Sequence, residues 1–152
     1  MIDFTQCRTL KKTYAGANGN KISVLYENEV WMIKFPGLAK LNNNLHYENG
    51  CVSEYLGCHI FNALGVTAQE TLLGTYYSGG KERLVVACKD FTTNGEVIQD
   101  FVSLKNQMID SERNGYGTEL SDILETLKEQ KLYDYEKLKE HFWDVFIVDA
   151  LI

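Results

Sequence analysis

The sequence predicts an α+β protein in which a strand-rich first part precedes a helical second part. Before residue 90 several short segments are rich in strand-forming residues, whereas from about residue 96 the apolar residues recur at the spacing of an α-helix. The charge changes at the same place. Residues 1–95 hold 9 Lys/Arg and 8 Asp/Glu, a net of +1, and residues 96–152 hold 6 and 13, a net of −7. These two changes indicate two structurally different parts in a chain of 152 residues.

Four strands are expected in the first part, paired as an antiparallel sheet. Their side chains alternate or are rich in β-branched and aromatic types, and the last run is apolar throughout, as in a central strand. Glu27-Asn28-Glu29 can turn the chain between the first two strands, and Ser78-Gly79-Gly80-Lys81 between the last two. The four segments are residues 22–26, 30–35, 70–77 and 83–88.

Three helices are predicted by apolar residues three and four positions apart. The first covers residues 52–64, packs on the sheet and ends at Gly65, with Ser53 or Gly50 as its N-cap. A second has its apolar stripe at residues 120–127 with Thr118 as its N-cap. Asp134 is expected to cap the last helix.

Composition excludes several classes of function. The net charge of −6 argues against a broad nucleic-acid-binding surface. No apolar run approaches the roughly 20 residues that cross a membrane, and residues 1–6 do not have the pattern of a signal peptide. The expected location is therefore the cytoplasm. Cysteines occur at positions 7, 51, 58 and 88 without metal-ligand spacing, so we expect reduced, partly buried thiols.

The last residues form an apolar helical run, Phe146-Ile147-Val148-Asp149-Ala150-Leu151-Ile152, with no Gly, Asn or Pro after it. Chain termini are usually solvated, so this pattern suggests a domain cut in its middle. An uncovered apolar helix can be covered by self-association through residues 138–152 or by folding back on the helix of residues 118–130; we expect self-association, because a two-fold pairing needs no other sequence.

One constellation of residues has a recognisable chemistry. A Gly-rich segment, Tyr14 to Lys21, precedes a strand carrying Lys34 and a helix carrying Glu54. Glycines let backbone amides approach phosphate oxygens, a lysine can reach the same phosphates, and a helix glutamate can orient that lysine. The alternatives are an ordinary hairpin, a solvated strand lysine and a glutamate that favours the helix dipole. Spacing alone does not choose between them.

The order of the segments resembles that of the HipA-like Ser/Thr kinases, and more closely their small, bacterial CtkA-type branch. No single motif is decisive, but the five segments occur in the order of the family and span nearly the whole chain. They are Tyr14-Ala15-Gly16-Ala17-Asn18-Gly19-Asn20-Lys21, Trp31-Met32-Ile33-Lys34-Phe35-Pro36, Ser53-Glu54-Tyr55-Leu56-Gly57-Cys58-His59-Ile60, Leu84-Val85-Val86-Ala87-Cys88-Lys89-Asp90-Phe91 and Phe142-Trp143-Asp144-Val145-Phe146-Ile147-Val148-Asp149-Ala150-Leu151-Ile152.

The resemblance implies a kinase-like N-lobe in residues 1–91 and the beginning of a helical C-lobe in residues 92–152, truncated before the catalytic loop. The Gly-rich segment would cover ATP phosphates, Lys34 would contact them, and residues 87–91 would be the hinge strand beside adenine, with a register known to one residue. The implied nucleotide-binding residues are Gly16, Ala17, Asn18, Gly19, Lys21, Lys34, Glu54, Ala87, Cys88, Lys89 and Phe91.

The resemblance assigns no residue of this chain to the catalytic base or to a metal ion, because in the family these residues follow the last helix. Phosphoryl transfer needs the base and the magnesium ligands together. We therefore expect a chain that alone binds ATP weakly and transfers no phosphoryl group, with Mg²⁺ bound only in a complete family member. The substrate protein is not implied. The alternative is a non-catalytic interaction module that keeps the N-lobe shape.

Overall fold

The computed structural model describes residues 1–14, 20–36, 49–92, 95, 98, 101 and 119–152. Four of the predicted nucleotide-binding residues, Gly16, Ala17, Asn18 and Gly19, lie outside the described residues. The chain forms two compact units, Met1–Asn94 and Gly95–Ile152, and each is considered by itself below.

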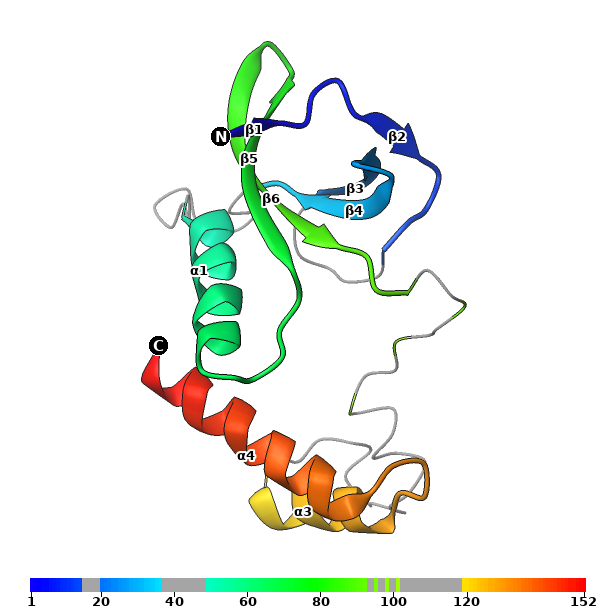
Figure 1. Ribbon diagram of the computed structural model, residues 1–152, viewed down its shortest axis with the longest axis vertical. Helices are drawn as coiled ribbons and strands as arrows, with labels where there is room; N and C mark the ends of the chain where they lie inside the picture. The colour runs from blue at the N-terminus through cyan, green and yellow to red at the C-terminus, as the bar shows by residue number, and fades with distance from the viewer. Residues whose placement is uncertain (15–19, 37–48, 93–94, 96–97, 99–100, 102–118) are drawn as a thin grey trace. The chain divides into compact units, whose positions relative to one another are not determined.

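The first unit is built on a curled six-stranded sheet with the strand order β1-β5-β6-β4-β3-β2 (Figure 1). The four predicted strands are all present, with ends that differ from the prediction by two residues or fewer. The strands are β1 (Ile2–Asp3), β2 (Arg8–Leu10), β3 (Lys21–Tyr26), β4 (Glu29–Lys34), β5 (Thr71–Ser78) and β6 (Lys81–Lys89).

Two tight turns fix the register of the hairpins. Glu27 and Asn28 between β3 and β4 both have positive φ, 50° and 64°, and so do Gly79 and Gly80 between β5 and β6, 59° and 81°. Two central residues in the left-handed region match the twist of the flanking strands. The first turn sets Lys21 directly opposite Lys34, so these two lysines share one face of the sheet.

Strands β1 and β2 were not predicted, and β1 makes the sheet mixed rather than purely antiparallel. It runs parallel to β5, with Ile2 opposite Gly74 and Asp3 opposite Thr75. The amide of Phe4 donates to the carbonyl of Thr75 at 2.9 Å. Phe4 itself is fully buried, so the N-terminal segment docks through its side chain as well as through its backbone.

The sheet has an apolar cluster on each face. One face buries Phe4, Trp31, Ile33 and other residues of the main core. On the other face Cys51 of α1 (Gly50–Ala63) packs with Val86 and Cys88, and Met32 joins them. Helix α1, which lies beside β5 in Figure 1, therefore covers the face that carries Lys34.

The helix boundaries follow local signals in part. Gly65, at φ +84°, ends α1 as predicted, but its N-cap is Asn49 and not Ser53 or Gly50. No side chain caps α1, because Asn49 makes no cap hydrogen bond.

The second unit contains α3 (Leu120–Glu129) and α4 (Tyr135–Leu151), which pack on each other. Asp134 caps α4 as predicted, because its carboxylate accepts from the amide of Lys137 at 3.0 Å. The N-cap of α3 is Glu119 rather than Thr118, which lies outside the described residues. In the described parts of the chain, no helix is both long enough and apolar enough to cross a membrane.

Candidate functional site

The centre of the candidate site is an ion pair between the sheet and the helix that covers it. Lys34, the last residue of β4, donates to the Oε1 atom of Glu54 in α1. The two side chains are 27% and 30% exposed, so the pair is shielded on most sides. Its position does not fit the alternatives of a solvated strand lysine or a dipole-favouring glutamate. Glu54 is the fifth residue of α1, whose first turn holds no acidic residue.

The local sequence explains why Lys34 points toward α1. Ile33, its neighbour, is fully buried in the core on the opposite face, and successive side chains of a strand point to opposite faces. Burial, the largest single effect, works against the charge of the lysine, but the hydrogen bond to Glu54 and the interactions with nearby negative groups together outweigh it. The pKa of Lys34 is therefore raised above its ordinary value.

Thiols surround this ion pair. The Sγ atom of Cys88 donates to Glu54 Oε1 at 3.4 Å, and that of Cys51 donates to the carbonyl of Lys34 at 3.5 Å. Burial raises the pKa of Cys88 to about 12 and also raises those of Cys51 and Cys58. All four cysteines are free, as the sequence predicted.

The side chains of the predicted hinge strand point to both faces of the sheet. Ala87 is fully buried in the main core, whereas Cys88 lies on the Lys34 face. The ammonium group of Lys89 is turned to Glu70 and Glu29, at 3.3 and 3.5 Å, and lies 6.0 Å from the ring centroid of Trp31. The structure thus brings Cys88 beside Lys34 and Glu54, but not the side chains of Ala87 and Lys89.

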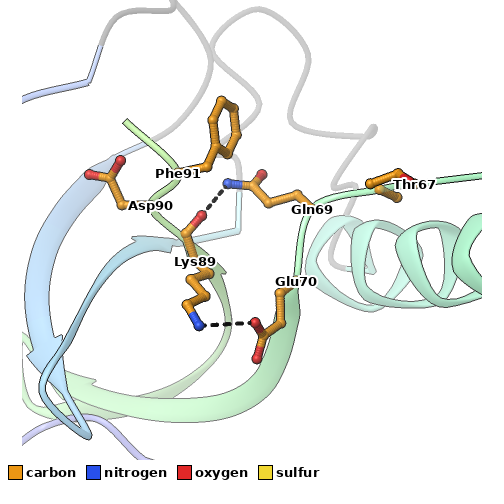
Figure 2. Close-up of a pocket in the computed structure, with 7 residues that line it drawn as sticks. Thr67, Gln69, Glu70, Lys89, Asp90 and Phe91 are labelled. Carbon is orange, nitrogen blue, oxygen red and sulfur yellow. Dashed lines mark hydrogen bonds and ion pairs between the residues drawn. The ribbon is translucent and has the colours of Figure 1, made fainter. Parts of the chain in front are cut away.

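Beyond the end of β6 lies a pocket of about 440 Å³ (Figure 2). The pocket is lined by the end of β6 and by the segment that connects α1 to β5. Gln69 donates from Nε2 to the carbonyl of Lys89 at 2.8 Å, and Phe91, 58% exposed, presents its ring at the pocket. The lining residues are Thr67, Ala68, Gln69, Glu70, Lys89, Asp90 and Phe91. Lys34 and Glu54 do not line this pocket, so the predicted residues fall into two neighbouring groups.

Two residues of this region were missed from the sequence. Gln69 belongs to the pocket through its bond to Lys89, and Asp90 is buried beside it with ties to Lys12 and Tyr14. Asp90 belongs to the predicted hinge strand, residues 87–91, but it is not among the predicted nucleotide-binding residues. Tyr14 is 76 residues and Lys12 is 78 residues (90 − 12) away from Asp90 along the chain, so no local spacing could have revealed these partners. Within the described residues, no group of three or more His, Cys, Asp or Glu is placed to hold a metal ion.

The chain is similar to a known kinase over nearly its whole length. It is 50% identical over 152 residues to the Ser/Thr protein kinase CtkA of Helicobacter pylori, a match that covers 99% of this chain and 46% of CtkA. The crystal structure of the H. pylori proinflammatory kinase CtkA matches with a TM-score of 0.89 and 49% identity. That match covers 99% of this chain and 50% of the crystallised one. No protein-family model matches.

The chain thus spans about half the length of the relatives that it matches. The α+β fold predicted from the sequence is confirmed, and it is the fold of the corresponding part of CtkA. The resemblance to the CtkA-type Ser/Thr kinases is confirmed in sequence and in fold across 99% of this chain.

Proposed function

We propose that this chain is the nucleotide-binding part of a CtkA-type Ser/Thr kinase. The ion pair between Lys34 and Glu54 carries this proposal, because an active protein kinase needs a strand lysine held by a helix glutamate. The parent reaction is transfer of the γ-phosphoryl group of ATP to a Ser or Thr hydroxyl of a protein.

The residues around the ion pair suit a nucleotide. Lys21 and Lys34 stand opposite each other on one face of the sheet, so the proposal places two ammonium groups near the phosphate oxygens. The pocket at the hinge, about 440 Å³, lies within the usual size of a ligand site, and Phe91 offers an aromatic ring to a base. We assign phosphate binding to Lys34 and Lys21, and adenine binding to the main chain of residues 87–91.

The same proposal limits what the chain does alone. Lys34 and Glu54 position phosphates but supply neither a base for the attacking hydroxyl nor ligands for Mg²⁺. Assayed without further polypeptide, the 152-residue chain binds ATP or ADP no tighter than about tens of micromolar and transfers no phosphoryl group. Incorporation of labelled phosphate into protein by the purified chain would contradict the second half of this proposal.

Titration calorimetry with ADP tests the binding half. Lys34→Ala is expected to weaken binding by about tenfold, because one charged contact of about 1.4 kcal/mol is lost. Lys81→Ala is the control, since Lys81 is an exposed lysine at the first position of β6 in the same unit. Equal affinity of Lys34→Ala and the parent chain would refute the assignment of Lys34.

A second candidate is a non-catalytic interaction module with the shape of a kinase N-lobe. The exposed apolar side chains of α4 favour it, among them Phe146 at 54% and Ile147 at 53% exposure. The calorimetric titration separates the two candidates. If neither the parent chain nor Lys34→Ala binds nucleotide, the interaction module is the better description.

A further inference from the structure

Near the free end of the β5–β6 hairpin (Figure 1) the first unit has another pocket, of about 400 Å³. We call it the hairpin pocket. Its volume lies within the usual range for sites that take small organic ligands. Seven residues line it, all of them in the described part of the chain: Asn20, Lys21, Ile22, Phe35, Tyr76, Ser78 and Arg83.

The strand register places the hairpin pocket on the face of the sheet that α1 does not cover. Ile22, Phe35 and Tyr76 pack against the main core, which lies on that face. Arg83 is directly opposite Tyr76, and opposed residues of an antiparallel pair share a face. Ser78 follows Tyr76 by two positions in β5, so it shares the face as well. The hairpin pocket is therefore separate from the ion pair, which lies on the face that α1 covers.

The walls of the hairpin pocket are largely aromatic. The rings of Phe35 and Tyr76 meet edge to face, with centroids 5.2 Å apart and an angle of 81° between their planes. Ile22 is the third apolar residue of the lining, and all three side chains are only partly buried. Such a surface suits the ring of a small aromatic ligand, which can pack against it edge to face or with an offset.

The hairpin pocket also contains a hydrogen-bond donor without an acceptor. The Nε atom of Arg83 is shielded from solvent and has no hydrogen-bond partner among the described residues. The Nη2 atom of the same group lies beside the turn, 3.8 Å from the place that a Cβ atom on Gly79 would take. None of the seven lining residues is acidic, so the lining does not neutralise the guanidinium. A shielded donor on a charged group is costly to leave unpaired, and an absent anion is one explanation for it.

The single guanidinium favours a ligand with a single negative charge. Lys21 also lines the pocket, but the register sets it opposite Lys34, and we assign its ammonium group to the other face. Arg83 is then the one cation of the site, with the Ser78 hydroxyl as a neutral donor. A guanidinium can donate two parallel hydrogen bonds to the two oxygens of a carboxylate, and it neutralises one charge in doing so. A carboxylate therefore fits better than a doubly charged phosphate monoester.

We propose that the hairpin pocket binds a small aromatic carboxylate. The carboxylate accepts from the Nε and Nη2 atoms of Arg83, once rotation of this half-buried side chain turns that edge toward the ligand. Ser78 donates a further hydrogen bond, and Phe35 and Tyr76 pack against the aromatic ring. The ligand thereby supplies the acceptor that Nε lacks. The proposal does not depend on nucleotide binding, because the ion pair and the hinge lie elsewhere in the unit.

NMR chemical-shift titration of the isotope-labelled chain with sodium benzoate tests this site. A ligand of this size is expected to bind with a dissociation constant of about one millimolar. Benzamide, which keeps the ring without the charge, and acetate, which keeps the charge without the ring, should each bind at least about fivefold more weakly. The largest shifts should come from Ile22, Tyr76 and Ser78. Benzamide that binds as well as benzoate, or shifts confined to α1 and the strand residues facing it, overturns the proposal.

Substitution of the arginine tests its role. Arg83→Gln should weaken benzoate at least about fivefold and leave benzamide within about twofold of the parent chain. Arg83→Met, whose unbranched side chain keeps the packing, serves if Arg83→Gln does not fold. Arg8→Gln is the control, because Arg8 is an exposed arginine of β2 in the same unit and the change of charge is the same.

Each remaining outcome has one meaning. Equal benzoate affinity of Arg83→Gln and the parent chain, or an equal loss in Arg8→Gln, overturns the assignment of Arg83. A parent chain that does not bind benzoate overturns the site itself. A parent chain that binds benzoate but not ADP supports this inference and counts against the proposed function.

Discussion

At the scale of single residues, the ion pair of Lys34 and Glu54 depends on the protonation of the thiol beside it. Because burial raises the pKa of Cys88 to about 12, Cys88 remains a neutral donor at physiological pH. It adds a hydrogen bond to Glu54 Oε1 instead of a second negative charge. The thiol therefore supports the carboxylate that orients Lys34.

The hydrogen bonds that Asp90 accepts from Lys12, Tyr14 and Thr92 lead to a prediction about the stability of the fold in acid. A carboxyl whose pKa is lowered in the folded state contributes stability that is present above its unfolded pKa, ordinarily 3.8, and is lost as the pH falls through the folded value. We expect Asp90→Asn to be less stable than the parent chain at pH 7. The difference between their free energies of unfolding should shrink as the pH falls below about 4.

Urea unfolding of both proteins between pH 7 and pH 3 measures this difference. Asp3, whose pKa is also lowered, chiefly by its hydrogen bond from Thr5, is present in both chains and cancels in the comparison. A difference that stays constant over the whole range would show that the charge of Asp90 does not stabilise the fold.

At the scale of elements, the prediction succeeded for the strands and helix ends that depend on residues close together in the sequence. Alternation and turn residues gave the four long strands, Gly65 gave the end of α1, and Asp134 gave the start of α4. Strands β1 and β2 are two and three residues long, too short for a period to be visible. Strand β1 is held by its pairing with β5 and by the burial of Phe4 beside it, and β2 by its pairing with β3, so both depend on contacts between residues distant in the sequence.

The candidate site was likewise predicted only in part from the sequence. The pairing of Lys34 with Glu54 was predicted from the order of segments along the chain, and the structure brings the two side chains together. The hydrogen bonds of Asp90 were missed, because Asp90 and Tyr14 are 76 residues apart in the sequence and are brought together only by the fold. The faces of Ala87 and Lys89 also could not be derived, since the register of an all-apolar strand is not marked by alternation.

Gly74 allows a direct test of how β1 docks. A Cβ atom at this position would lie 2.5 Å from the carbonyl oxygen of Ile2 and would also clash with the Phe4 ring. Gly74→Ala is therefore expected to lower the free energy of unfolding by about 1–3 kcal/mol, as overpacking usually does. Ser78→Ala in the same strand is the control. Urea unfolding followed by circular dichroism provides the measurement, and an unchanged midpoint would mean that the N-terminal segment does not pack as described.

At the scale of the whole molecule, the second unit leaves much apolar surface uncovered. Val148 of α4 is 5% exposed, whereas Phe146 and Ile147 are more than half exposed and Leu151 is 76% exposed. The rings of Phe142, Trp143 and Phe146 also contact one another on α4. Burying one large apolar side chain is worth about 1.5–3 kcal/mol, so covering this surface would stabilise the chain substantially.

We therefore predict that the chain self-associates through residues 138–152, because a two-fold pairing of α4 helices covers the apolar surface with the same surface of a second copy. Light scattering at micromolar concentration should give a mass above the 17.4 kDa of one chain. The double substitution Phe146→Glu and Ile147→Glu should return it to a monomer, since paired like charges are not tolerated across such a contact. Leu132→Glu, at an exposed position ahead of α4, should leave the mass unchanged. If the parent chain is instead a monomer whose α4 amides exchange slowly, packing within the chain already covers the helix, and self-association is not needed to explain it.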